Sequence, residues 1–461
     1  MDTKIKQYSP ITKSHLFFYS INSETSKIEF LLYKYNKSSE YSTVHVDILP
    51  SDNAPTFAIC REITNTFFNL FTKSVLAKLF KKEEITSQDV NYSTEAIKPY
   101  RLWEQNSYKE YLDKFSQNII QYDDINNEVI YFLEIPYINI DFLNDSLSKI
   151  SVPFSFMFCG KETINTIALN ADTKKLFDLF PYDKMISHIK STEETMKNDK
   201  CDYYIILACK KQGDDQVGFF HFPALFQGIY RKNTEKWVYL VASTDELPNE
   251  ELLNKAKCLI IPGSDLNVYN ELDFLRKTEK FLYSLINDIL YNKKYPQLKL
   301  LGICFGMEIF ISALEGKISN MGKGVFERFP ADIMIKDDFW NLNFVKKSCV
   351  EKTKSLRLCE AHGDYIDTFP EKYGFILMGD SKNCKNELLV HPNEKIFMIQ
   401  GHPEYYPPFN YNRFAPIFLK RMKNDESDES IEKFITNELG NEQSKNVNIH
   451  QWRSICYSFM K

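Results

Sequence analysis

The chain has 461 residues, 43% of them hydrophobic and 26% charged, which is enough for two or three globular domains. A net charge of −5 without a long basic run argues against nucleic acid or a membrane surface as the expected partner. The first residues, "MDTKIKQYSPITKSH", lack the apolar core of a signal peptide, and no stretch reaches the roughly 18 apolar residues of a membrane helix. The sequence therefore predicts a cytoplasmic protein.

The first 195 residues predict an α+β domain. Short runs rich in β-branched and aromatic residues predict strands, and one long amphipathic stretch after Asp52 predicts a helix. The predicted strands are 15–21, 27–35, 43–49 and 128–140, and the predicted helix is 54–80. The polar stretch 190–200 predicts the boundary to the next domain.

A stretch of the predicted helix, "CREITNTFFNL" (60–70), is similar to the middle of a Nudix box. Aligned on Arg61, the metal-binding glutamates of that box fall on Asn65 and Thr66, so metal-dependent pyrophosphate hydrolysis is not expected. Two interpretations stay open: a degenerate Nudix-like domain, or an unrelated α+β domain whose Arg-Glu pair is solvent-exposed. In both, we expect a role in recognition or assembly.

From Cys201 onward, continuous apolar runs alternate with amphipathic stretches, which predicts an α/β domain with a parallel sheet covered on both faces. The predicted strands are 201–209, 236–243, 256–264 and 298–306, with a helix at 270–292 and a further apolar run at 394–409. We place this domain at 201–422, followed by a charged C-terminal tail or helix at 423–461.

The strongest chemical signal is "KLLGICFGMEIF" (299–310), which places Cys304 between two glycines at the end of a predicted strand. A nucleophile on a sharp strand-to-helix turn requires small flanking residues, and a helix N-terminus favours the thiolate. The next backbone N–H, that of Phe305, would point at a developing oxyanion. A buried structural cysteine between two glycines remains the simpler interpretation of this motif alone.

A second motif, "QGHPEY" (400–405), supplies what a thiol nucleophile requires. His402 and Glu404 are separated by one residue, so in extended backbone they share a face and the carboxylate can orient the imidazole. A solvated surface pair is the alternative. Because both motifs end apolar runs in the same half of the chain, we favour a Cys–His–Glu site.

Three segments in this order resemble class I glutamine amidotransferases: "IIPGS" (260–264), "LLGICFGMEI" (300–309) and "MIQGHPEY" (398–405). The resemblance covers about 201–420 and implies a flavodoxin-like parallel sheet flanked by helices. It also implies that N–H groups near Gly263 and Ser264, with that of Phe305, stabilise the oxyanion.

Within this family, standalone γ-glutamyl peptidases have segments similar to "ALEGKISNMGKGVFERFP" (313–330) and "EAHGDYIDTFPEKYGFILMGDSKN" (360–383). His362 and Asp364 fall on their His-x-Asp stretch, which lines the substrate side. His362 alone would be interpreted as a hydrogen-bonded surface histidine. Two residues depart from the family pattern: Glu308 stands where glutamine is usual, and Glu315 replaces a glycine. Glu308 would lie beside the α-amino-acid end of a substrate and alter its selection.

The function expected from this resemblance is hydrolysis of a γ-glutamyl amide, in glutamine or a γ-glutamyl peptide, through a thioester on Cys304. The small substrate is the expected partner. No P-loop motif is visible, so a strict amidotransferase would need a separate ammonia-accepting synthase, and residues 1–195 offer a second possible protein contact. The alternative is a non-catalytic scaffold built from degenerate enzyme domains. The ten cysteines show no CxxC motif, so we expect no disulfide framework, no metal ion and no cofactor.

Overall fold

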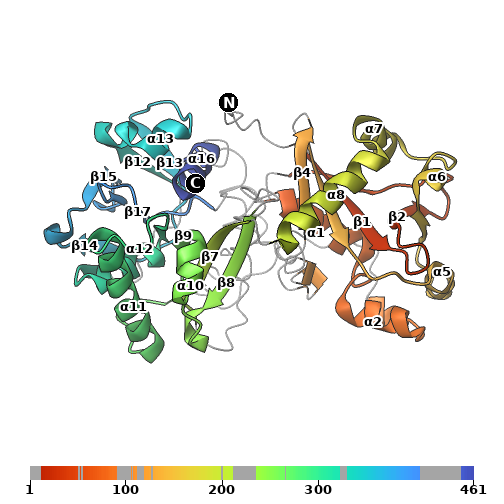
Figure 1. The fold of residues 1–461 in the computed structure, drawn as a ribbon, viewed down its shortest axis with the longest axis horizontal. Helices are drawn as coiled ribbons and strands as arrows, with labels where there is room; N and C mark the ends of the chain where they lie inside the picture. Colours follow the sequence, from red (N-terminus) through yellow and green to blue (C-terminus); the bar gives the residue numbers. More distant parts are fainter. Residues whose placement is uncertain are drawn as a thin grey trace, which may run out of the picture. The chain divides into compact units, whose positions relative to one another are not determined.

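The structure is a computed structural model that forms two compact units, each described here by itself (Figure 1). The residues it describes are 12–49, 52, 55–90, 105, 107–108, 110–111, 119–125, 128–198, 201–210, 235–264, 266–321, 330–404 and 448–461. Those up to 198 belong to the N-terminal unit and those from 201 to the C-terminal unit. None of the described helices is long and apolar enough to cross a bilayer.

The N-terminal unit is an α+β domain around a mixed sheet. The strands run in the order β4-β5-β1-β2-β6, with β3 also paired to β1. They are β1 (Lys13–Ile21), β2 (Ile28–Tyr35), β3 (Val44–Asp47), β4 (Ile119–Ile125), β5 (Glu128–Glu134) and β6 (Phe154–Cys159). The helices are α1 (Pro55–Phe67), α2 (Lys73–Lys81), α3 (Ser87–Val90), α5 (Ile140–Lys149), α6 (Lys161–Ile164), α7 (Ala171–Leu179) and α8 (Tyr182–Lys197). Phe17 and Phe132 pack with α7 and α8 in one core cluster, whereas Phe18 contacts Phe71, so the sheet is covered on both faces.

The predicted helix 54–80 is two helices, because Phe68 has φ 47 and the chain turns before α2 begins. The expected solvent exposure of the Arg-Glu pair is wrong for Arg61, which is buried. The Arg61 guanidinium donates two hydrogen bonds of 2.9 Å to the carboxylate of Asp52. The Arg61–Asp52 ion pair therefore joins α1 to the segment before it, which is a structural role.

The C-terminal unit contains a nine-stranded sheet in the order β13-β12-β15-β16-β17-β10-β9-β7-β8. The strands are β7 (Asp202–Ala208), β8 (Glu235–Val241), β9 (Ala256–Ile261), β10 (Lys299–Ile303), β12 (Ala331–Ile335), β13 (Ser355–Leu358), β15 (Ile376–Asp380), β16 (Leu388–Val390) and β17 (Ile396–Ile399). A separate ladder joins β11 (Lys317–Asn320) to β14 (Asp364–Thr368). The helices are α10 (Glu250–Lys255), α11 (Asp273–Leu290), α12 (Phe305–Ala313), α13 (Asn343–Lys347) and α16 (Ile449–Met460), with short 3-10 turns η2 (Ala242–Thr244), η3 (Asp337–Asn341) and η4 (Glu371–Tyr373).

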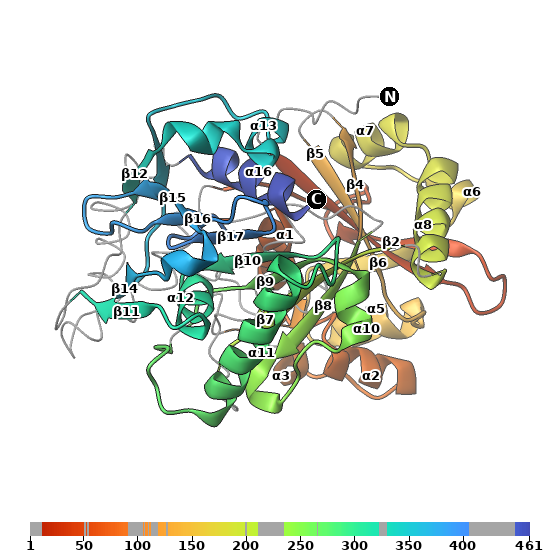
Figure 2. The same cartoon turned by 60° about the vertical axis from the view of Figure 1, so that its left-hand side comes forward.

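The half of this sheet from β17 to β8 is parallel, which confirms the predicted α/β fold. Its strands are apolar on both sides because helices cover both faces. Met398 packs with residues of α11 and α12, whereas its neighbour Phe397 contacts Phe344 and Phe459 on α13 and α16. Figure 2 shows α10 and α11 alongside strands β7 to β10. The other half of the sheet is antiparallel and was not expected.

Helix α16 lies inside the stretch expected to be a charged tail or helix, and it is part of the core of the C-terminal unit. Trp452, Cys456 and Phe459 are fully buried. The remainder of that stretch, including the charged run 423–434, lies outside the described residues.

Helix α12 approaches β9 closely at Gly306. A Cβ atom there would overlap the carbonyl oxygen of Ile261, and one at Gly302 would lie 2.6 Å from a ring carbon of Phe310. The two glycines around Cys304 are thus required by backbone packing, whatever the role of the thiol.

Replacing Gly306→Ala should lower the free energy of unfolding of the C-terminal unit by about 3 kcal/mol or more, because rigid backbone must move to admit the methyl group. Urea unfolding followed by circular dichroism measures this. Gly160→Ala is a matched control, since no atom lies within 4 Å of its added Cβ. Equal effects of the two changes would contradict the proposed contact.

Candidate active site

Cys304 occupies the turn between β10 and α12 in a conformation that few residues adopt. Its φ is 51 and ψ is −115, and it is the residue directly before the helix. Its backbone N–H donates to the carbonyl of Ile399, so the turn is tied to the end of β17. A non-glycine residue held at positive φ stores strain, and such strain is a recurring property of nucleophile turns.

The order of the strands explains how distant motifs meet. β10 lies between β9 and β17 and is parallel to both. Parallel neighbours end at the same edge of a sheet, so the segments that follow them lie together. Gly263 follows β9, Cys304 follows β10 and His402 follows β17.

Gly263 is the point at which these residues come together. A Cβ atom built on it would lie 2.9 Å from Cε1 of His402 and 3.6 Å from Cβ of Cys304. The imidazole and the thiol side chain therefore flank the same backbone position. A side chain at position 263 would collide with the imidazole, which accounts for glycine there.

Glu404 orients His402. Nδ1 of His402 lies 2.7 Å from Oε1 of Glu404, and both side chains are buried. A carboxylate only accepts hydrogen bonds, so Nδ1 carries the proton and Nε2 is left as the basic nitrogen. The guanidinium of Arg453, on α16, donates to the carbonyl oxygens of Pro403 and Glu404 and holds this segment.

The expected oxyanion residues divide into two kinds. The backbone N–H of Phe305 interacts with the Cys304 sulfur and lowers the pKa of the thiol. The hydroxyl of Ser264 instead donates to the carbonyl of Cys209 at 2.6 Å and accepts from the N–H of Leu266. The Ser264 side chain thus shapes the loop after β9, which leaves only backbone groups of that loop for an oxyanion.

The thiol of Cys304 is protonated in this environment. Burial raises its pKa well above the ordinary value, and the nearby carboxylates of Glu308, Glu404 and Glu360 act in the same direction. The Phe305 N–H lowers the pKa but is outweighed. The expectation that the helix N-terminus favours a thiolate is therefore not met without a substrate, because desolvation dominates.

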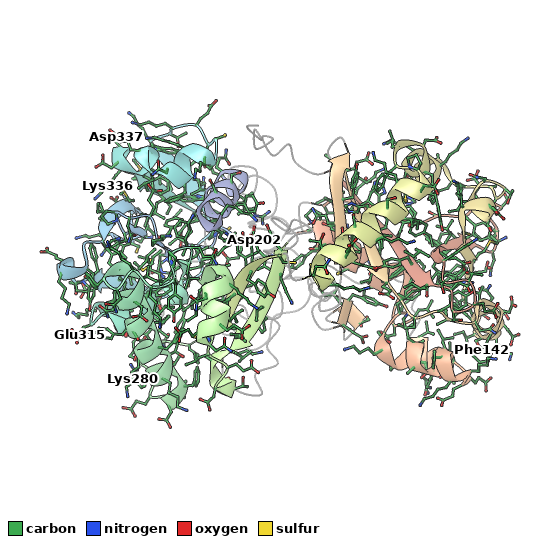
Figure 3. The ribbon with its side chains drawn as sticks, viewed as in Figure 1. Phe142, Asp202, Lys280, Glu315, Lys336 and Asp337 are labelled. Carbon is green, nitrogen blue, oxygen red and sulfur yellow. The ribbon has the colours of Figure 1, made fainter. Side chains whose placement is uncertain are left out.

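Glu308, at the position where glutamine was expected, is buried and hydrogen-bonded. Nε2 of Gln400 donates to its Oε1 at 2.9 Å. Burial, assisted by the charge of Asp364, raises the pKa of Glu308 to about 7, while Gln400 and His362 oppose the shift. Near neutral pH the side chain is therefore partly a neutral acid, close to the glutamine it replaces in shape and charge. The other departure, Glu315, is solvent-exposed and pairs with Lys372. Figure 3 shows Glu315 at the periphery of the C-terminal unit.

His362 and Asp364 are both buried beside Glu308. Nδ1 of His362 lies 2.8 Å from the backbone oxygen of Asp364, and the Asp364 carboxylate accepts hydrogen bonds from Tyr269 and Asn320. His362 is not the surface histidine of the simpler interpretation.

Several polar residues of this region were not predicted: the buried Glu360, Glu387, Gln400 and Arg453, and the exposed Tyr269 and Asn320. Charged side chains are read from sequence as surface residues, and nothing local shows that Glu360 and Glu387 are fully buried. Of the described residues, Glu360, His362 and Glu387 are the group that could hold a metal ion. Their proximity to the His-x-Asp stretch and to strand β16 appears only in three dimensions.

Comparisons with known proteins concern the C-terminal unit. Residues 241–419 match the family model for glutamine amidotransferase class-I, so the C-terminal unit contains a class I glutamine amidotransferase domain. Its homologues include gamma-glutamyl peptidase 5 of Arabidopsis thaliana, which is 26% identical over 58% of this chain and 98% of its own length. The glutamine-hydrolyzing GMP synthase of Wigglesworthia glossinidia brevipalpis is 32% identical over 38% of this chain and 31% of its own length.

A solved structure of a glutamine amidotransferase from Thermotoga maritima covers 56% of this chain and 98% of its own, with 18% identity and a TM-score of 0.40. The family match begins at residue 241, so it does not extend to the N-terminal unit. The Nudix-like resemblance of residues 60–70 gains no support from it.

The buried acid Glu308 predicts a pH effect on stability. The pKa of Glu308 is about 7 in the folded chain, above the ordinary value of 4.5. The contribution of Glu308 to the free energy of unfolding is therefore complete below pH 4.5 and is lost as the pH rises through 7. Glu308→Gln removes this titration, and its stability relative to the wild type should increase by on the order of 3 kcal/mol from about pH 5 to about pH 8.

Urea unfolding at a series of pH values measures the difference. Glu351→Gln, which changes an exposed glutamate of the same unit, controls for the loss of one negative charge. A difference between Glu308→Gln and the wild type that does not vary with pH would contradict the raised pKa.

Proposed function

We propose that the chain hydrolyses a γ-glutamyl amide bond, in glutamine or a γ-glutamyl peptide, through a covalent thioester on Cys304. The observation that carries this proposal is the convergence of the Cys304 thiol and the Glu404-bound imidazole of His402 on Gly263. A thiol on a strained turn, a base and an orienting carboxylate are the parts that acyl transfer requires.

In the first step, Nε2 of His402 removes the thiol proton while the sulfur attacks the amide carbon of the substrate. The carbonyl oxygen becomes an oxyanion, which the N–H of Phe305 and backbone N–H groups after β9 stabilise. The imidazolium, held by Glu404, returns the proton to the leaving nitrogen, so that ammonia or an amine departs and the thioester remains.

In the second step, water attacks the thioester carbon and His402 accepts its proton. The new tetrahedral intermediate collapses, glutamate leaves and the sulfur regains a proton from His402. Because burial raises the pKa of the Cys304 thiol, we place proton removal in the attack itself.

The substrate would lie against Glu308, His362 and Asp364, a polar wall that contains two carboxyl groups. A γ-glutamyl donor presents an α-ammonium group that suits such a wall, and the gamma-glutamyl peptidase relatives favour a small donor of this class. The GMP synthase relatives support a second mode, in which a synthase partner consumes the released ammonia.

The alternative is a non-catalytic binding role for the same pocket. The observation that favours it is the burial of Cys304 among carboxylates, which keeps the sulfur neutral. The N-terminal unit would then provide the contact with a protein partner. The two functions differ in whether glutamate is released.

Release of glutamate from glutamine, γ-glutamyl dipeptides and glutathione tests the proposal. Cys304→Ala should reduce kcat by at least about a thousandfold, and Glu404→Gln, which keeps the shape but weakens the orientation of His402, by about a hundredfold. Cys349→Ala, which removes an exposed thiol, should leave the rate unchanged. Absence of release by the wild type, together with no labelling of Cys304 by a glutamine-like electrophile, would support the binding role instead.

A further inference from the structure

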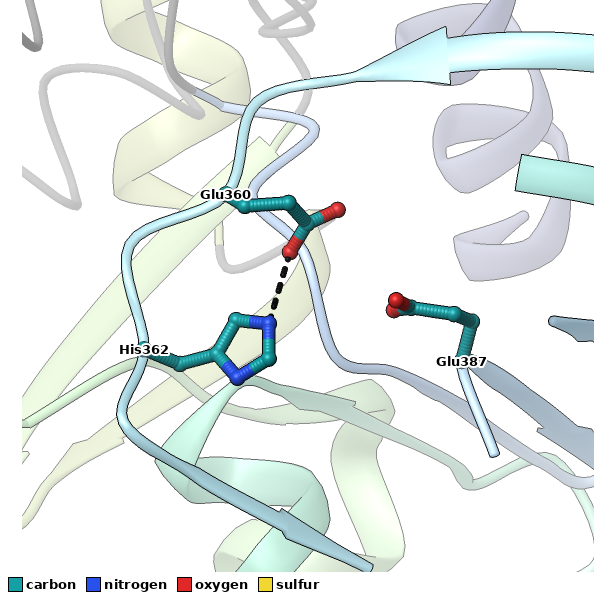
Figure 4. Close-up of side chains that lie close together, drawn as sticks. All are labelled: Glu360, His362 and Glu387. Atoms are coloured by element: carbon teal, nitrogen blue, oxygen red, sulfur yellow. Dashed lines mark ion pairs between the residues drawn. The ribbon is translucent and has the colours of Figure 1, made fainter. Parts of the chain in front are cut away.

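A second group of buried side chains lies next to the proposed triad and takes no part in its proton transfers, although one member, His362, was placed against the substrate above. Glu360 and His362 lie in the segment after β13, and Glu387 is the residue directly before β16 (Figure 4). Each offers a ligand atom, and the three atoms lie within 4.8 Å of one another. Both glutamates are fully buried and His362 is 3% exposed, so this is an interior cluster and not a solvated acidic patch.

The hydrogen bond of His362 fixes which ring nitrogen faces the cluster. Nδ1 lies 2.8 Å from the backbone oxygen of Asp364, and a carbonyl oxygen only accepts, so Nδ1 carries a proton. In the neutral ring, Nε2 then presents a lone pair. Nε2 lies 3.2 Å from Oε2 of Glu360, as the dashed line in Figure 4 shows.

This arrangement is the one that metal-ligating histidines adopt. Such histidines bind the metal through one nitrogen and donate the other N–H to a carboxylate or a backbone carbonyl, which sets the tautomer and the ring orientation. A carboxylate on either side of Nε2 completes a three-ligand set, with water free to take a fourth position. The Glu387 carboxylate points toward the space between the other two side chains in Figure 4.

We propose that Glu360, His362 and Glu387 bind one divalent first-row transition-metal ion, of which Zn²⁺ is the representative. Two oxygen ligands and one imidazole suit Zn²⁺, Mn²⁺ or Fe²⁺, whereas Ca²⁺ requires six or more oxygens and Mg²⁺ retains most of its water. No thiol belongs to this ligand set, so the spacing of the cysteines in the sequence gives no sign of the site. The proposal is independent of the amidase function.

The ion would act on the triad through two short connections. The Cα of Gly401 passes so close to Glu360 that a Cβ there would overlap Oε1 of Glu360. The N–H of the next residue, His402, donates to the carbonyl of Cys359 at 2.7 Å. A metal ion that holds Glu360 therefore also fixes the backbone that carries His402.

Metal binding by the full chain tests the proposal directly. After removal of metals with a chelator, the wild type should take up one Zn²⁺ per chain in isothermal titration calorimetry, and Zn²⁺ should raise its unfolding temperature. Glu387→Gln and Glu360→Gln preserve shape and remove one ligand each, so each should weaken binding at least about tenfold. Glu128→Gln is the matched control, because it alters the buried His15–Glu128 pair of the N-terminal unit and should leave Zn²⁺ binding unchanged.

Substitution with Co²⁺ identifies the ligands. Oxygen and nitrogen ligation gives visible d–d bands without the thiolate-to-cobalt charge-transfer band of a cysteine site. The proposal is overturned if the wild type binds no Zn²⁺, if the glutamine variants bind it unchanged while folded by circular dichroism, or if the charge-transfer band appears. In the first case a protonated His362 paired with Glu360 explains the contact.

Discussion

The site depends on one close packing contact, that of the first turn of α12 against the end of β9. Gly306 leaves no room for a Cβ beside the carbonyl of Ile261, and this sets the height of Cys304 above the sheet edge. Because β10 lies between β9 and β17, the same contact brings the turn at 304 level with Gly263 on one side and His402 on the other. Backbone packing thus assembles three segments that lie far apart in the sequence, and side chains only complete the arrangement.

The sequence predicted the parallel half of the C-terminal sheet well, because buried parallel strands are continuous apolar runs and α11 has a clear helical period. It missed the antiparallel half. β12, β13, β15 and β16 are three to five residues long, too short for a pattern to emerge, and the first three also contain polar residues. In the N-terminal half, helix 54–80 was predicted as one element because the change of direction at Phe68 is a backbone event without glycine or proline to mark it.

The proposed triad residues could be selected from the sequence because they stand in short motifs that end apolar runs. Their electrostatic environment was not predictable in the same way. The helix N-terminus beside Cys304 can be read from the sequence, but the burial of Glu308, Glu360 and Glu404 around it is set by elements up to a hundred residues away. The helix N-terminus alone predicts a lowered pKa for the Cys304 thiol, but burial by distant segments raises that pKa instead. The same burial places acidic residues that would be expected at the surface in an interior cluster.

Helix α16 lies beyond the last residue of the family match, yet its Arg453 binds the backbone of Pro403 and Glu404 and its apolar face completes the core. During translation, the residues of the triad leave the ribosome before this helix is made. The segment that carries the catalytic base is then without its guanidinium support until residues 449–460 have folded back. The proposed thiol–imidazole pair therefore gains this support only after Arg453 has been synthesised and α16 has packed against the segment of residues 403–404.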